Sequence, residues 1–293
     1  MKEILRHFTG VVSVIYLIFI LSLAVLLLVI ISIPRLLPFN AVKKYITALS
    51  NEFGNAIVWF LKVTLGFIHR PKWSVEYPDN ISTKNWYIGM SNHMSWADIF
   101  VLLFTSNYKI PLLKFFMKKE LKWIPIIYLV HKTIDMPFLN RHKASEIRSN
   151  PSLKSLDFEN ARIAAKRFTR YPTTAFSFVE GTRFSEIKKE AQSSPYDDLL
   201  KPKVGALATA LSGMPMVEEL IDFTIIYKTP RRSAWDFACG EMREAKIIIR
   251  AYKIPTFIRD TDDIGSAKFR SEFKLFIDDI WSKKQKLISE VKF

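Results

Sequence analysis

The feature that most limits how this chain can fold is a long uncharged stretch near its N-terminus. No charged side chain occurs from Phe8 to Ile33, about 26 residues that would form a helix of roughly 39 Å, against a hydrocarbon core of about 30 Å. The stretch is too long for the apolar region of a signal peptide, and no small-x-small cleavage pattern follows Pro34. The sequence therefore predicts a retained membrane helix.

A second apolar pattern, from Tyr45 to Ile68, predicts another helix soon after the first. Apolar residues recur there at three- and four-residue intervals, which places them in one stripe. Such a helix lies in the headgroup plane or packs on the rest of the protein, and we favour the interfacial position. Basic residues are more numerous after the first helix than before it, which predicts that the larger part of the chain is cytoplasmic. A re-entrant helix pair would leave both ends on that side.

From Trp73 onward, strand and helix patterns alternate, which predicts a single α/β domain. We expect strands at 73–77, 86–90, 110–113, 136–139, 173–178, 221–227 and 246–254, and helices at 95–103, 118–130, 153–170, 204–211 and 266–287. The polar stretch 185–203 predicts a mobile loop that closes over a substrate. The chain thus divides into an N-terminal membrane segment, 1–70, and a folded domain, 71–293.

The net charge of +15 indicates an anionic partner without saying which one. Nucleic acid, anionic lipid and anionic substrates all fit this charge. The basic residues are scattered instead of forming a stripe with exposed aromatic residues, so a membrane-tethered nucleic-acid-binding module is the less favoured alternative. The single cysteine, Cys239, excludes an internal disulfide, and no His or Cys partner stands at a spacing that predicts a metal site.

A histidine and an aspartate with four residues between them, His93 and Asp98, are the first candidate site. An imidazole can take a proton from an alcohol, while a carboxylate on its other nitrogen fixes the tautomer and stabilises the imidazolium. The same spacing also fits a helix cap beside a surface histidine. We expect a helix that starts near Ser95 to bring Asp98 back toward His93 and to offer backbone N–H groups to an oxyanion. Ser95 itself reads as a helix-start residue in preference to a nucleophile.

The second candidate site follows the expected strand Thr173–Phe178 and consists of Glu180, Gly181, Thr182 and Arg183. Glycine permits a tight turn, threonine offers a hydroxyl, and the arginine fork matches two phosphate oxygens. Glu180 cannot attract a phosphate, so we expect it to bond an arginine or turn amides. The motif therefore predicts a phosphate site.

The two motifs together, with Asn92 before the histidine, resemble the glycerolipid acyltransferases of the lysophosphatidic acid acyltransferase (PlsC) type, in a YihG-like bacterial branch. Asp135–Arg141 resembles the acceptor-binding block of that family, in which Arg141 matches and Asp135 replaces the usual glycine. Ile221–Tyr227 resembles an apolar strand block, here without the valine-proline pair of many members. The resemblance covers roughly 85–227.

The resemblance implies a mixed central sheet flanked by helices, with an N-terminal helix pair that anchors the catalytic domain, 71–293, to the bacterial inner membrane on its cytoplasmic side. It implies transfer of a fatty acyl group from acyl-CoA or acyl carrier protein to a lysophospholipid hydroxyl. The expected acceptor is 1-acyl-sn-glycerol-3-phosphate and the expected product is phosphatidic acid. Another lysophospholipid acceptor is the alternative, and no cofactor is expected.

The resemblance also implies the roles of the site residues. His93 would act as the general base and Asp98 would orient it. The phosphate would bind Arg183, Thr182, Gly181 and Arg141. Asn92 and Glu180 would support the site.

Overall fold

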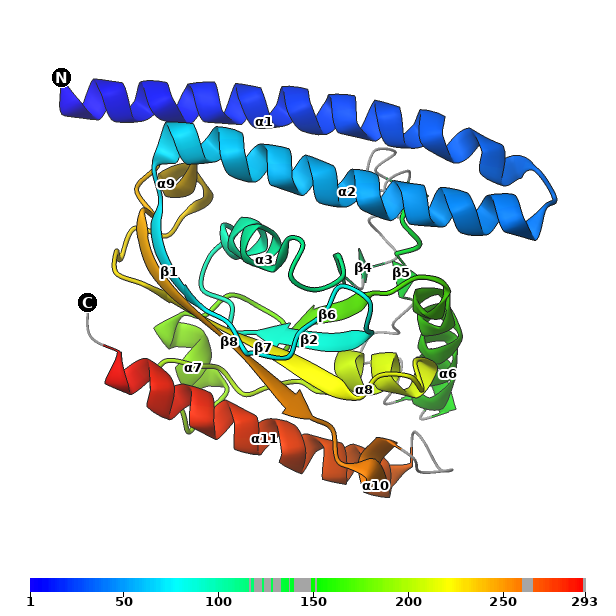
Figure 1. The fold of residues 1–293 in the computed structure, drawn as a ribbon. Helices are drawn as coiled ribbons and strands as arrows, with labels where there is room; N and C mark the ends of the chain where they lie inside the picture. Colours follow the sequence, from blue (N-terminus) through cyan, green and yellow to red (C-terminus); the bar gives the residue numbers. More distant parts are fainter. Residues whose placement is uncertain are drawn as a thin grey trace.

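The computed structural model describes residues 1–115, 117–118, 123, 128, 133–136, 138–139, 149–150, 152–259 and 266–291 of the chain. Two long N-terminal helices lie together along one side of an α/β domain, and a long C-terminal helix covers the opposite side (Figure 1). Arg141, His131, His142 and most of the expected helix 118–130 lie outside the described residues.

The described elements follow the chain in this order. They are α1 (Lys2–Ser32), η1 (Ile33–Leu36), α2 (Asn40–His69), β1 (Lys72–Glu76), β2 (Tyr87–Ser91), α3 (Asp98–Ser106), β3 (Leu113–Phe115), β4 (Met117–Lys118), β5 (Phe138–Leu139), α6 (Ser152–Ala165), η3 (Lys166–Arg170), β6 (Thr174–Phe178), α7 (Glu186–Ala191), α8 (Gly205–Gly213), β7 (Glu219–Tyr227), α9 (Ala234–Ala238), β8 (Glu244–Lys253), α10 (Thr256–Arg259) and α11 (Ala267–Glu290).

The main sheet has six strands in the order β1-β8-β7-β2-β6-β3. Only the β7–β8 pair is antiparallel, so the sheet is mixed, as predicted. The central strand β2 is buried along its whole length, because helices cover both faces of the sheet. In Figure 1, α3 lies between the sheet and α2, while α8 and α11 cover the other face.

A buried ion pair joins the C-terminal helix to the sheet. Lys284 of α11 donates to the carbonyl oxygen of Phe223 at 2.8 Å and pairs with Asp222 at 2.8 Å. Its ammonium also lies 4.4 Å from the centroid of the Trp281 ring. A buried charge is stable only with such compensation, so this pair fixes where α11 sits on β7.

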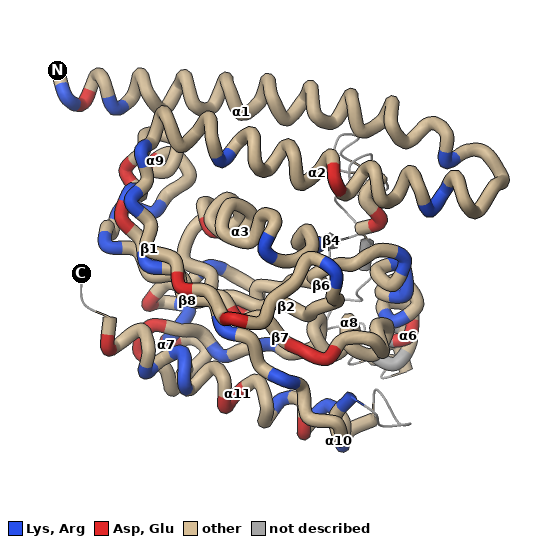
Figure 2. Tube along the Cα trace, viewed as in Figure 1, with Lys and Arg blue, Asp and Glu red and all other residues tan. Residues whose placement is uncertain are grey.

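The helix α1 has the length and composition to cross a bilayer, and only 11% of its most apolar window is buried against the protein. Figure 2 shows no charged residue along it between its first turns and the turn that follows it. Two hydrogen bonds join it to α2: Ser13 to His69 at 3.0 Å, and Tyr16 to Thr64 at 2.6 Å. The two helices therefore form one unit.

The second helix, α2, packs on the domain, which is one of the two positions that its sequence left open. It packs on the domain through Leu61 and Leu65, which are almost fully buried, yet it leaves Trp59 and Phe67 exposed. The exposed apolar residues fit a helix that also contacts lipid.

Two sequence expectations need correction. The stretch 185–203 is not all loop, because it contains α7, whose N-cap Ser185 accepts a hydrogen bond from the backbone N–H of Lys188. A serine at the N-cap followed by Glu186 is a helix-start signal that the polar composition concealed. The expected strand 110–113 begins later, at Leu113.

The edge strand β3 carries a buried lysine. Lys114 is 1% exposed, and no hydrogen bond or ion pair joins it to another residue within the described ranges. Burial lowers its pKa to about 8, against the charge of Asp135, which raises it. The buried ammonium therefore destabilises the fold at neutral pH.

We expect Lys114→Met to raise the free energy of unfolding at pH 7, by up to about 3 kcal/mol. The folded state of the wild type binds the Lys114 proton less tightly than the unfolded state, so wild-type stability rises between pH 8 and pH 10.5. The advantage of the variant should shrink over that window. Denaturation in detergent at pH 7 and at pH 10.5 measures the difference in free energy of unfolding between the variant and the wild type. Lys268→Met, at an exposed position, is the control. A variant less stable than wild type at pH 7 would contradict the prediction.

Candidate active site

Two neighbouring strands bring the two sequence motifs to one edge of the sheet. β2 and β6 run parallel, with Ser91 opposite Phe178, and each motif begins directly after these residues. Ligands of open α/β sheets bind outside the carboxyl ends of the strands. The register therefore places the histidine loop beside the Gly-Thr-Arg turn.

His93 and Asp98 form the pair that their spacing predicts. Nδ1 of His93 lies 2.8 Å from Oδ2 of Asp98, which is the first residue of α3. With the carboxylate as acceptor, Nδ1 is the donor, so the neutral ring in this tautomer carries its lone pair on Nε2. The ring stacks on Phe178, with the centroids 3.9 Å apart and an interplanar angle of 17°. The stacking and the carboxylate together fix the direction of Nε2.

The carboxylate of Asp98 is fully buried and accepts three further hydrogen bonds. Oδ2 receives the N–H groups of Met94 at 2.6 Å and Ser95 at 2.9 Å, and Oδ1 receives the hydroxyl of Tyr227 at 2.7 Å. Burial and the charge of Asp98 raise the pKa of Tyr227 well above 10. The amides of Met94 and Ser95 are thus bound to Asp98, so the expectation that amides at this helix start hold an oxyanion is wrong for these two.

The expected helix start near Ser95 is three residues too early, because α3 begins at Asp98 with Ala97 at its N-cap. The hydroxyl of Ser95 donates to the carbonyl oxygen of Arg232 at 2.5 Å and accepts the N–H of Ala97 at 3.1 Å. The side chain is buried, and no His ring bonds it within the described residues. Ser95 therefore has no base to activate it as a nucleophile.

Glu180 links the two motif loops. Its two oxygens accept the N–H of His93 at 2.8 Å and the N–H of Leu200 at 3.1 Å. The carbonyl oxygen of His93 in turn accepts the N–H of Phe184 at 2.7 Å. Burial raises the pKa of Glu180 to about 7, against the two amide bonds, which lower it. From the sequence we expect Glu180 to bond either an arginine or backbone amides. In the structure it bonds two backbone amides.

Asn92 supports the histidine from the other side. Its amide donates to the carbonyl oxygen of Ile225 at 2.8 Å and its oxygen accepts the N–H of Ile225 at 2.9 Å. These two bonds extend the pairing of β2 and β7 beyond the last strand residue, Ser91. Asn92 therefore holds the start of the histidine loop against the sheet.

The Gly-Thr-Arg turn has cations around it. Gly181 has φ +70°, a backbone conformation that favours glycine, and a Cβ there would lie 3.4 Å from the ammonium of Lys203. The ammonium of Lys188, from α7, donates to the hydroxyl of Thr182 at 2.9 Å. The guanidinium of Arg183 is exposed and lies 5.0 Å from the ring centroid of Trp96. Three cations thus surround the turn, and Lys188 was missed because its segment was expected to be loop.

A cavity of ≈ 610 Å³ joins the two motifs. His93 and Arg183 both line it, as the sequence predicted. The rest of the wall is mainly apolar and includes Leu21 of α1, Ile57 of α2 and Phe115 of β3. The cavity therefore has the imidazole of His93, the guanidinium of Arg183 and an apolar lining shared with the N-terminal helices.

Asp135 and Met136 are described, whereas Arg141 lies outside the described residues. Asp135 has φ +58°, in the left-handed region that favours glycine and that aspartate also adopts. This is why aspartate can stand where glycine is usual in this block. Its carboxylate accepts a hydrogen bond from Arg35 at 2.8 Å and one from Thr47 at 3.2 Å. Asp135 thus ties the block to the N-terminal helices.

Comparisons with known proteins identify the family of this chain. A sequence model of the acyltransferase family matches residues 72–228, more than half of the chain, so the chain belongs to the acyltransferase family. A search of curated proteins finds no match. Among solved structures, the chain is similar to the crystal structure of the 1-acyl-sn-glycerophosphate (LPA) acyltransferase PlsC from Thermotoga maritima. The TM-score is 0.52 and the identity 14%, over 94% of this chain and 97% of that one.

These findings confirm the predicted acyltransferase family, and the likeness to the PlsC structure confirms the predicted fold. The YihG-like branch stays a prediction. Within the described residues, no three His, Cys, Asp or Glu side chains gather in a group that could hold a metal ion.

We expect Tyr227→Phe to weaken the His93–Asp98 pair while both of these side chains remain present. The variant leaves Oδ1 of Asp98 buried without its donor, so the free energy of unfolding should fall by about 1.5–3 kcal/mol and kcat for acyl transfer by about tenfold. Melting curves and steady-state rates measure both. Tyr252→Phe is the matched control, because no bond of its hydroxyl to another described residue is present. Equal rates and stability for Tyr227→Phe and wild type would refute the role.

Proposed function

We propose that this acyltransferase moves a fatty acyl group from an acyl-CoA or acyl carrier protein thioester to the free hydroxyl of a lysophospholipid. The proposed acceptor is 1-acyl-sn-glycerol-3-phosphate, and the product is phosphatidic acid. The observation that carries the proposal is the single cavity lined by His93 and Arg183. It offers a base and a phosphate-binding group to one small molecule.

In the proposed reaction, Nε2 of His93 takes the proton of the acceptor hydroxyl as the oxygen attacks the thioester carbonyl carbon. The carbon–sulfur bond then breaks, and the imidazolium returns the proton to the departing thiolate. One ester bond forms and one thioester bond breaks. The proton moves from the acceptor hydroxyl through His93 to the thiol, so the enzyme ends in its starting protonation state. Asp98 stabilises the imidazolium between these steps through its contact with Nδ1. The scheme needs no covalent enzyme intermediate and no cofactor.

The phosphate of the acceptor would bind the turn 181–183. Arg183 has an exposed guanidinium for two phosphate oxygens, and Gly181 lets the backbone approach closely. Lys188 adds a charge beside the hydroxyl of Thr182. Fixing the phosphate would position the hydroxyl of the same molecule for His93. Arg141 remains a proposed partner on the basis of the family resemblance.

The apolar part of the cavity would hold acyl chain. Its wall includes residues of α1 and α2, and α1 has the properties of a membrane helix. A lipid could therefore enter from the bilayer without passing through water. We place the protein at the bacterial inner membrane with its domain on the cytoplasmic side, in line with the distribution of basic residues.

We expect His93→Ala to lower kcat by about 100- to 10,000-fold, because general-base catalysis contributes about that much. The variant should still insert in membranes and keep its affinity for the acceptor. Steady-state rates with purified membranes, radiolabelled acyl-CoA and lysophosphatidate measure this. His7→Ala, an exposed histidine of α1, is the control. Normal turnover by His93→Ala would rule out the mechanism.

We expect Arg183→Ala to act on binding instead. The loss of a charged hydrogen bond of about 1.5–3 kcal/mol should raise KM for lysophosphatidate about 10- to 150-fold. The KM of Arg183→Lys should lie between those of wild type and Arg183→Ala, because lysine keeps the positive charge but lacks the planar guanidinium fork. Arg162→Ala, on α6, is the matched control. An unchanged KM for lysophosphatidate would exclude Arg183 from the phosphate site.

A panel of lysophospholipids with different headgroups, supplied with one radiolabelled acyl-CoA, identifies the acceptor. A diacyl product from lysophosphatidate alone supports the proposed acceptor. A product only from another lysophospholipid selects the alternative acceptor. No product from any member, together with salt-dependent retention of DNA, would select the membrane-tethered binding module.

A further inference from the structure

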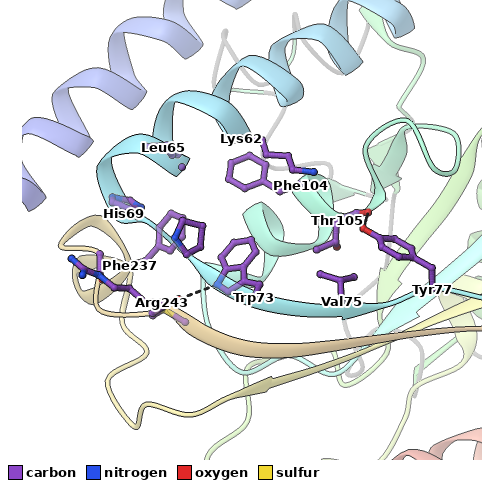
Figure 3. A pocket seen from close by; sticks show the side chains of 14 residues that line it. Lys62, Leu65, His69, Trp73, Val75, Tyr77, Phe104, Thr105, Phe237 and Arg243 are labelled. Atoms are coloured by element: carbon purple, nitrogen blue, oxygen red, sulfur yellow. Dashed lines mark hydrogen bonds between the residues drawn. The ribbon is translucent and has the colours of Figure 1, made fainter. Parts of the chain in front are cut away.

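A second cavity lies beside the C-terminal part of α2. It has a volume of ≈ 280 Å³ and shares no lining residue with the cavity at His93. Figure 3 shows its walls, which come from α2, β1, the C-terminal end of α3 and the segment around Phe237 and Arg243. Leu103 of α3 lines the first cavity and Phe104 lines the second. The catalytic proposal makes no use of this space.

The lining is apolar because its polar aromatic groups already have partners. The indole N–H of Trp73 donates to the carbonyl oxygen of Met242 at 3.1 Å. The hydroxyl of Tyr77 donates to the carbonyl oxygen of Thr105 at 2.9 Å. Both bonds run to the backbone, so the rings present their carbon faces to the cavity (Figure 3). An occupant would therefore be held mainly by apolar contact.

Cations without carboxylate partners border the cavity. Lys62 and Arg243 line it, and the ammonium of Lys109 lies 5.3 Å from the ring centroid of Tyr77. Within the described ranges, none of the three pairs with a carboxylate, and all three are exposed. Burial and the charge of Lys109 lower the pKa of Lys62. The mouth of an apolar cavity thus carries uncompensated positive charge, which suits an amphiphilic anion.

The wall on the α2 side has a gap at Gly66. A Cβ added there would meet nothing within 4 Å, so no contact requires glycine at this position. Glycine inside a helix costs about 1 kcal/mol relative to alanine. The same part of α2 exposes Trp59, Val63 and Phe67, which would lie in lipid beside the gap. The cavity therefore borders the lipid-facing side of α2.

We infer that this cavity binds one acyl chain of an anionic phospholipid from the surrounding leaflet, with the phosphate near Lys62 and Arg243. The volume is just below the usual range for ligand pockets, about 300–1,000 Å³, and so suits part of one chain. The bound lipid would hold the β1 edge of the domain against the bilayer. The inference needs α1 in a membrane and does not depend on the proposed reaction.

Photolabelling tests the inference with the full chain in phosphatidylcholine nanodiscs. The probe is phosphatidylglycerol with a photoreactive group near the end of one chain, and the labelled peptides are identified by mass spectrometry. We expect label on β1 or on Phe104 and Thr105. A phosphatidylcholine probe with the same chain should label these sites about tenfold less, because its choline cation offsets the phosphate charge that attracts Lys62 and Arg243.

Gly66→Leu should obstruct the gap on the α2 side of the cavity and abolish this label, whereas Gly66→Ala, which adds one methyl group, should keep it. Lys62→Gln should reduce the phosphatidylglycerol label to the phosphatidylcholine level, which keeps the test valid if Gly66→Leu does not fold. His93→Ala should label like wild type even if it has no activity. Label confined to the outer surfaces of α1 and α2, or insensitive to both Gly66→Leu and Lys62→Gln, would overturn the inference.

Discussion

The buried carboxylate of Asp98 is the group around which the candidate active site is organised. It accepts four hydrogen bonds, from the His93 ring, the Met94 and Ser95 amides and the Tyr227 hydroxyl. A buried anion is stable only when such donors surround it, so the histidine loop, the start of α3 and the end of β7 must meet at this point. The bond that stabilises the fold here is the one that orients the proposed base.

The order of the strands decides that the two motifs share a site. β2 and β6 are neighbours, although the segments between them in sequence include α3 and α6. Glu180 then fixes the distance between the loops, because each of its oxygens holds an amide, one from His93 and one from Leu200. A rigid connection of this kind is what a base and a phosphate site need in order to act on one molecule.

The N-terminal helices line cavities in addition to carrying the predicted membrane segment. α2 forms part of the wall of both cavities and α1 part of the first, and Arg35, which follows α1, bonds Asp135 beside the first one. Both proposed lipid chains would therefore lie against α2. The large positive charge of the chain fits a protein whose partners are anionic lipids at a membrane surface.

The sequence by itself determined the apolar helix, the alternation of strands and helices, and the short-range chemistry of His93 with Asp98 and of Gly181 with Arg183. These depend on residue spacing within one segment, which a sequence shows directly. Tyr227 as a partner of Asp98, Leu200 as a partner of Glu180 and the unfilled space at Gly66 depend on contacts between residues distant along the chain. Only the tertiary structure decided them, because strand order and helix packing bring those residues together, and no local pattern encodes either one.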